Sequence, residues 1–114
     1  MRNIALVSSM TEALEGIQEL YEGDQVVYSV TKLNVTTISD DATLQMWVYK
    51  KSKNVTSDVT TGSMSATKNV ATTKLFSNLT GGDMLHVTLQ GTCDGQLLTF
   101  AAFWLKVRKR SGLA

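Results

Sequence analysis

The side chains that most often perform acid–base or nucleophilic chemistry are scarce in this chain, which contains one histidine, His86, and one cysteine, Cys93. A catalytic or metal-binding role for His86 would need a second histidine, a cysteine or a carboxylate at a fixed offset, and the sequence shows none. Cys93 lies between glycines, where an exposed thiol could react, but no partner base accompanies it. We therefore expect no enzymatic activity, no cofactor and no metal site.

Aspartates accumulate where the sequence predicts turns, and loops that gather carboxylates can bind calcium. Their spacing matches no known calcium loop, and aspartate is common in turns because its side chain bonds its own backbone. The residues concerned are Asp40, Asp41, Asp58, Asp83 and Asp94. We interpret them as turn residues.

Aromatic side chains are the remaining candidates for chemistry, because a planar array of them can stack on a sugar or on a protein partner. The candidates are Trp47, Tyr49, Phe100, Phe103 and Trp104. In an extended strand, alternation places Trp47 with Tyr49 and Phe100 with Trp104. We expect most of them in the core, with an interface or a sugar-stacking platform as alternatives.

The strongest structural signal is a hairpin near the end of the chain. Two alternating apolar runs, residues 84–90 and 97–107, flank a turn at residues 91–95. The turn contains Asp94 and Gly95, and the Asp-Gly pair tolerates positive φ at little cost. This pattern predicts two antiparallel strands.

Similar short runs of Val, Thr, Leu and aromatic residues begin at residue 24, with turn signals about every 8 to 12 residues, as in sandwiches and barrels. Residues 43–50 read as a central strand that places Leu44, Met46 and Val48 on one face and Gln45, Trp47 and Tyr49 on the other. Further strands are predicted over residues 55–59, 64–68 and 70–76. The sequence therefore predicts an all-β, antiparallel β-sandwich over residues 24–110.

The first 23 residues have a different pattern of apolar residues from the rest of the chain. Residues 4–7 form a short β-type run, and Ser9 with Glu12 has the spacing of a helix capping box. Apolar residues then recur at helical spacing, which predicts either a short helix over residues 10–21 or an extended arm. We expect three parts: an N-terminal arm or anchor at residues 1–23, the sandwich, and a C-terminal tail at residues 111–114.

Composition excludes several classes of protein. The chain has 114 residues, which is enough for one self-sufficient core, and a formal net charge of +1, which gives no field for nucleic acid or membrane. The single cysteine indicates assembly in a reducing compartment, and no apolar run resembles a membrane span or a secretion signal. The expected location is the cytoplasm of the producing cell.

The two ends of the chain are oppositely charged, so they either are solvated or contact partners or neighbouring copies.

Two stretches carry a resemblance to known families. Residues 3–7 and 11–19 resemble the N-terminus of small tailed-phage virion proteins encoded among head genes. Residues 41–48 and 79–83 resemble immunoglobulin-like domains attached to phage capsids and tails. The resemblance implies an immunoglobulin-like sandwich that binds the outside of an assembled shell as a decoration, or cement, protein. It also implies the major capsid protein as partner, with neighbouring copies as possible further partners, and a place on the virion surface after synthesis in the host cytoplasm.

On this view residues 1–22 form the anchor, and deleting them should leave a folded domain that no longer binds shells. The residues expected to contact the capsid or a neighbouring copy are Ile4, Leu6, Leu14, Ile17, Leu20, Arg108 and Arg110. The alternatives are a phage tail or fibre component, or an immunoglobulin-like module that binds a surface or a glycan.

Overall fold

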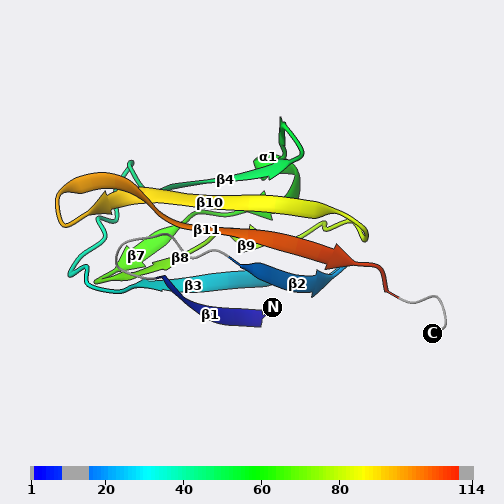
Figure 1. The fold of residues 1–114 in the computed structure, drawn as a ribbon, viewed down its shortest axis with the longest axis horizontal. Coiled ribbons are helices and arrows are strands. Elements are labelled where there is room, and N and C mark those ends of the chain that lie inside the picture. Colours follow the sequence, from blue (N-terminus) through cyan, green and yellow to red (C-terminus); the bar gives the residue numbers. More distant parts are fainter. Residues whose placement is uncertain (1, 9–15, 111–114) are drawn as a thin grey trace.

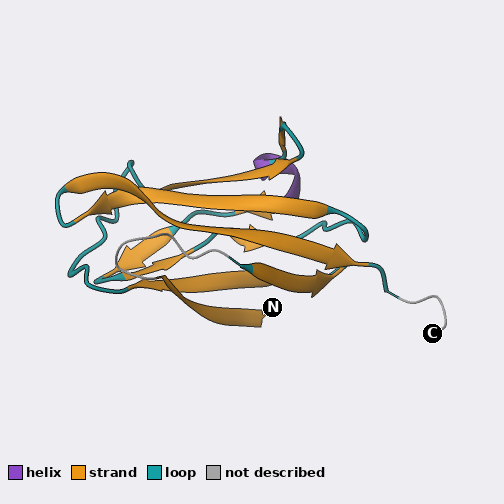
Figure 2. Ribbon diagram, viewed as in Figure 1, coloured by secondary structure: helices purple, strands orange, loops and turns teal. Residues whose placement is uncertain are grey.

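The computed structural model describes residues 2–8 and 16–110 and contains two β-sheets packed face to face (Figures 1 and 2). The first, here called the β3 sheet, contains β1 (Arg2–Ser8), β3 (Val26–Lys32), β6 (Thr60–Thr61), β7 (Ser65–Thr67), β8 (Val70–Thr72) and β9 (Leu75–Phe76). The second, here called the β11 sheet, contains β2 (Ile17–Tyr21), β4 (Gln45–Lys50), β5 (Lys53–Asn54), β10 (Met84–Cys93) and β11 (Gln96–Arg108). The predicted all-β sandwich is confirmed.

The hairpin of β10 and β11 is confirmed as well. Cys93 and Gln96 are the last antiparallel pair before the turn. Asp94 and Gly95 form that turn with φ values of 48° and 86°. Both residues are therefore left-handed, which matches the right-handed twist of the two flanking strands.

The core lies between the two sheets, where alternate side chains of facing strands meet. Tyr28 on β3 is at its centre, with ring centroids 5.7 Å from Phe76 and 5.2 Å from Phe103. The largest fully buried side chains are Leu20, Val26, Tyr28, Val30, Ile38, Val48, Phe76, Leu85, Leu89, Phe100, Phe103 and Leu105. Leu44, Met46 and Val48 form the buried face of β4. The expectation that most of the aromatic candidates lie in the core is wrong, because only Phe100 and Phe103 are buried, whereas Trp47 is half-buried and Tyr49 and Trp104 are exposed.

A β-bulge in β11 changes which side chains face the core. Ala101 lies opposite Leu89, but the pairs nearer the turn are shifted by one residue, which leaves Phe100 without an opposite residue. Phe100 is consequently buried, whereas Trp104 is 45% exposed on the outer face. The expectation that these two aromatics share a face is therefore wrong.

The N-terminal residues are strands of both sheets. β1 pairs in parallel with β3, and β2 pairs in parallel with β11 (Figure 1). The predicted helix is wrong over Ile17–Tyr21, because those residues extend along β11 and bury Leu20. Residues 10–15 of that prediction lie outside the described residues. These pairings differ from the predicted division at residue 23, since both strands complete sheets of the sandwich.

Residues 55–59 were expected to form a strand, and this expectation is also wrong. The segment begins a short helix, α1 (Thr56–Val59), which follows β5. The Thr56 hydroxyl accepts a hydrogen bond of 2.8 Å from the backbone N–H of Val48, which ties the turn to β4. In the described part of the chain, no helix has the length and apolarity needed to cross a bilayer.

Candidate partner-binding surface

The residues predicted to anchor the chain lie in different environments. Ile17 is 58% exposed on β2, and Ile4 and Leu6 are half-buried on β1. Leu20 is only 1% exposed because it belongs to the core between the sheets, so the structure corrects its assignment as a contact residue. Leu14 lies outside the described residues. The anchor prediction therefore keeps its exposed members and loses Leu20.

The two basic residues predicted as contacts are paired within the chain. Arg108 lies beside Glu19, with 2.6 Å between Nε and Oε1, and Arg110 lies beside Asp24, with 2.9 Å between Nη2 and Oδ1. The pairing lowers the pKa of Glu19 and raises the pKa of Arg108. The acidic and basic ends thus meet in one molecule, where the ion pairs fasten β2 to the end of β11.

A row of four exposed or half-buried side chains crosses the outer face of the β11 sheet. Ile17 lies opposite Trp104, Trp104 lies opposite His86, and His86 lies opposite Tyr49. We call these four residues the outer apolar row. Trp104 is 45% and Tyr49 37% exposed, and the rings of Trp104 and His86 are 4.6 Å apart between centroids. Since adjacent strands are about 4.8 Å apart, the row is about 14 Å long.

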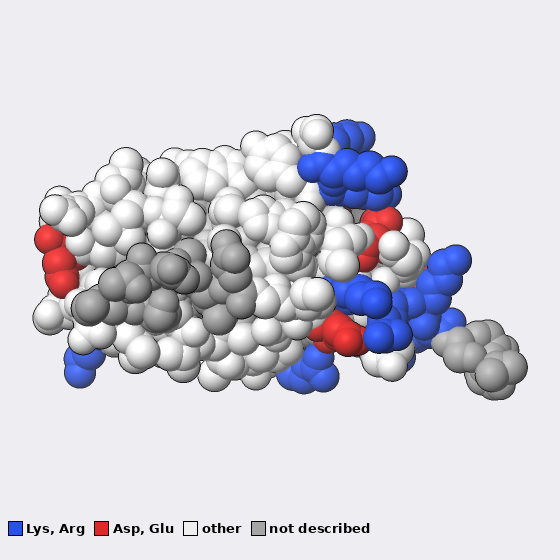
Figure 3. Space-filling view, in the orientation of Figure 1, with Lys and Arg blue, Asp and Glu red and all other residues white. Residues whose placement is uncertain are grey.

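Apolar and charged residues border this row on the same face. Trp47, two residues before Tyr49, is half-buried, and Met84, two residues before His86, is exposed. Glu19 and Lys106 form the next cross-strand pair toward the end of β11. In Figure 3 most of the charged side chains drawn in colour lie toward the two ends of the molecule, and the surface drawn in white lies mainly between them. Such an arrangement is typical of an apolar contact surface with a polar rim.

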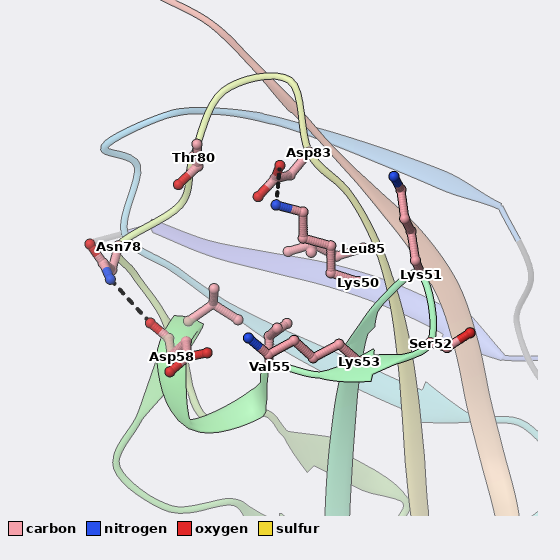
Figure 4. A pocket seen from close by; sticks show the side chains of 11 residues that line it. Lys50, Lys51, Ser52, Lys53, Val55, Asp58, Asn78, Thr80, Asp83 and Leu85 are labelled. Atoms are coloured by element: carbon pink, nitrogen blue, oxygen red, sulfur yellow. Dashed lines mark hydrogen bonds and ion pairs between the residues drawn. The ribbon is translucent and has the colours of Figure 1, made fainter.

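A separate pocket of about 660 Å³ opens beside the turn that joins β4 to β5 (Figure 4). Lys50 and Asp83 form an ion pair of 3.1 Å at its rim, and Lys51 and Lys53 are exposed there. Apolar side chains also line it: Val55, Val59 and Leu85. The lysines bring positive charge to the rim of the pocket, beside Asp58 and Asp83.

His86, Cys93 and Asp94, which the sequence offered as candidates for chemistry, make structural contacts in the folded chain. The His86 ring contacts the Trp104 ring in a tilted arrangement, and Cys93 is buried, so its thiol is not the exposed turn thiol considered from the sequence. Burial raises the pKa of Cys93, which disfavours the nucleophilic thiolate. Asp94 accepts hydrogen bonds of 2.9 to 3.1 Å from the backbone N–H groups of Thr36 and Thr37, which is a turn role. Across residues 2–8 and 16–110, no three His, Cys, Asp or Glu residues are grouped to hold a metal ion.

The outer apolar row escaped the sequence analysis as a unit, although three of its four members are aromatic. Sequence alternation identified Tyr49 and Trp104 separately, but only the pairing of β2, β11, β10 and β4 brings the row together. Comparison of the chain with models of protein families and with curated proteins found no match. The function is therefore inferred from these surfaces and from the sequence resemblance.

Proposed function

We propose that the chain is a structural virion protein that binds the outer surface of a phage capsid as a decoration, or cement, protein. It stabilises the shell or presents an immunoglobulin-like domain there, and its partner is the major capsid protein. The observation that carries the proposal is the outer apolar row. Soluble proteins seldom leave contiguous apolar surface uncovered unless it contacts something else.

The row suits a contact with a large particle because it lies on a rigid support. Trp104 is its central residue, flanked by Ile17 on one side and His86 on the other. Tryptophan near the centre of an interface often supplies a large part of the binding free energy. Because all four residues project from hydrogen-bonded strands, little side-chain or loop ordering opposes binding.

The ion pair between Glu19 and Arg108 supports the same surface indirectly. The pair joins Glu19, two residues after Ile17 on β2, to Arg108, four residues after Trp104 on β11. It therefore helps to hold Ile17 beside Trp104. Both charged side chains are about half exposed, at 47% each, so the pair itself contributes little to stability. Its role in the proposal is to position β2.

The experiment is co-sedimentation of the full chain with purified phage heads that lack it. Trp104→Ala should weaken binding by roughly 30-fold or more, the loss expected for an interface hot spot of about 2 kcal/mol. Leu97→Ala is the matched control, because Leu97 is an exposed residue of the same strand, at 58%, away from the row. Equal binding by Trp104→Ala and the unaltered chain would contradict the proposal.

A second candidate is a glycan-binding module, which is favoured by the exposure of Trp104 and Tyr49 on one face. Exposed aromatic rings stack on the apolar faces of sugars. Quenching or a shift of tryptophan fluorescence on adding polysaccharide, absent in Trp104→Phe, would favour it over capsid binding. Finding the protein on tails instead of heads by immunogold electron microscopy would favour a tail or fibre component.

A further inference from the structure

β1 lies at an edge of the β3 sheet. It contains seven residues, and among residues 2–8 and 16–110 it pairs only with β3. The Arg2 N–H donates to the Gln25 carbonyl, and the Ser8 carbonyl accepts from the Leu33 N–H, both at 2.9 Å. The backbone N–H and C=O groups of alternate residues point to opposite sides of a strand. Those of the even-numbered residues of β1 therefore point toward β3. The residues whose N–H and C=O groups point away from β3 are Asn3, Ala5 and Val7.

The other edges of the sandwich are shorter or blocked. On β2 the Tyr21 N–H donates to the Asp24 carboxylate at 2.9 Å, and the Tyr21 carbonyl accepts from the Asp24 N–H at 3.0 Å. β5 and β6 have two residues each, β7 has three, and β5 begins with Lys53. Proteins commonly protect sheet edges with short strands and charges. β1 has neither protection beyond Arg2 at its first position.

We infer that two copies of the chain pair through their β1 strands, antiparallel, about a two-fold axis at Ala5. The three residues whose backbone groups point away from β3, here called the outward set, are Asn3, Ala5 and Val7, and they are symmetric about Ala5. Asn3 therefore lies opposite Val7 of the second copy, and Ala5 lies opposite its own equivalent. Every outward N–H and C=O of the set then has a partner, and the two β3 sheets become one sheet. Shifting the axis by one or two residues along the strand leaves some of these groups unpaired.

The side chains of β1 fit the same pairing. Ile4 and Leu6 pack against the core but remain half-buried, because no strand of the described residues lies beyond them. In the pair, Ile4 lies opposite Leu6 of the second copy, so each covers the other. The only charged residue of β1, Arg2, lies opposite Ser8, and the two Arg2 residues are about 20 Å apart, beyond the range of strong repulsion. A self-complementary strand of this kind favours a second copy as the occupant.

The first test is sedimentation equilibrium of the full chain without shells, at micromolar concentration. The unaltered chain should be a dimer. Ala5→Lys and Ala5→Glu each place like charges opposite each other at the axis, so each should be monomeric, while an equal mixture of the two should regain the dimer. Thr67→Lys on β7, an exposed position at the opposite edge of the same sheet, is the matched control and should remain dimeric.

The second test is oxidative cross-linking, which does not rely on charge. Opposite hydrogen-bonded residues have Cα atoms about 5.5 Å apart, which a disulfide can span. Ala5→Cys should therefore cross-link to a covalent dimer. Val7→Cys lies on the same exposed face but about 14 Å from its equivalent, so it should not. The native Cys93 is buried and contributes little background.

Two results would overturn this inference. The unaltered chain could be monomeric throughout the concentration range, or its dimer could persist unchanged in both Ala5 charge variants. If the unaltered chain is monomeric and a separate binding assay shows that Ala5→Lys no longer binds shells, the edge takes a strand of the shell protein instead. Since the measurements of association use no shells, they succeed or fail independently of the proposed capsid binding.

Discussion

Trp104 on β11 and His86 on β10 lie directly opposite each other on the outer face of the β11 sheet, with ring centroids 4.6 Å apart. Their contact joins two halves of the outer apolar row, because Ile17 continues it on one side and Tyr49 on the other. A single rigid surface thus arises from four strands. The proposed binding of a capsid depends on this cross-strand pairing.

Tyr28 offers a test of the core. Its hydroxyl is buried and has no hydrogen-bond partner among the described residues. Because an unpaired buried hydroxyl opposes folding, Tyr28→Phe should raise the free energy of unfolding by roughly 1 kcal/mol. Urea denaturation measures the change. A loss of stability would indicate that the hydroxyl is hydrogen-bonded in the folded protein, for example to water.

Gly81 tests the packing between the loop before β10 and the end of β11. A Cβ atom at this position would lie 2.6 Å from Cγ and 2.7 Å from Cα of Lys109. Gly81→Ala should therefore lower the free energy of unfolding by about 1–3 kcal/mol, the usual cost of overpacking. Gly16→Ala is the control, because nothing lies within 4 Å of its added Cβ, and it should change stability by less than about 0.5 kcal/mol. Equal effects in thermal or urea unfolding would contradict the described loop packing.

The ion pair between Glu19 and Arg108 predicts a pH dependence. The Arg108 guanidinium lowers the pKa of Glu19 from its ordinary value of 4.5 in the folded chain. The stabilisation is therefore present above that ordinary pKa and is lost as the pH falls through the folded-state pKa. Glu19→Gln should have a slightly lower urea midpoint than the unaltered chain at neutral pH, because an exposed ion pair stabilises the fold only a little, and the difference should shrink as Glu19 becomes protonated in acid. A difference that persists in acid would exclude the ion pair as its cause.

Cys93 should behave as an inert thiol. It is 3% exposed, and burial raises its pKa, so the native protein should react slowly with Ellman's reagent at pH values near 8, where an exposed thiol reacts readily. Adding denaturant should release the full reaction within the time of unfolding. Rapid reaction of the native protein would show that the end of β10 opens to solvent.

Local sequence patterns were sufficient for much of the fold. The Asp94-Gly95 turn could be predicted from its residue types alone, because they tolerate the left-handed backbone that a tight hairpin requires. Met46 and Val48 alternate with Gln45, Trp47 and Tyr49, which identifies β4 as a strand with two distinct faces. In both cases the deciding interactions lie within a few residues of one another.

The failures share a different cause, which is competition from residues distant in sequence. Helical spacing over residues 10–21 was overridden where β11 offers a backbone partner to Ile17–Tyr21 and the core accepts Leu20. The alternation of β11 is broken at Phe100 by a bulge that depends on pairing with β10. The outer apolar row could not be predicted for the same reason, because only the order of the four strands in the sheet brings its members together.

Cryo-electron microscopy of phage heads decorated with the purified chain tests the central claim most directly. The account predicts added density on the outside of the shell, with the outer face of the β11 sheet and Trp104 against the capsid surface. Density that appears only on tails, or a sandwich that contacts the shell with Trp104 facing solvent, would contradict it.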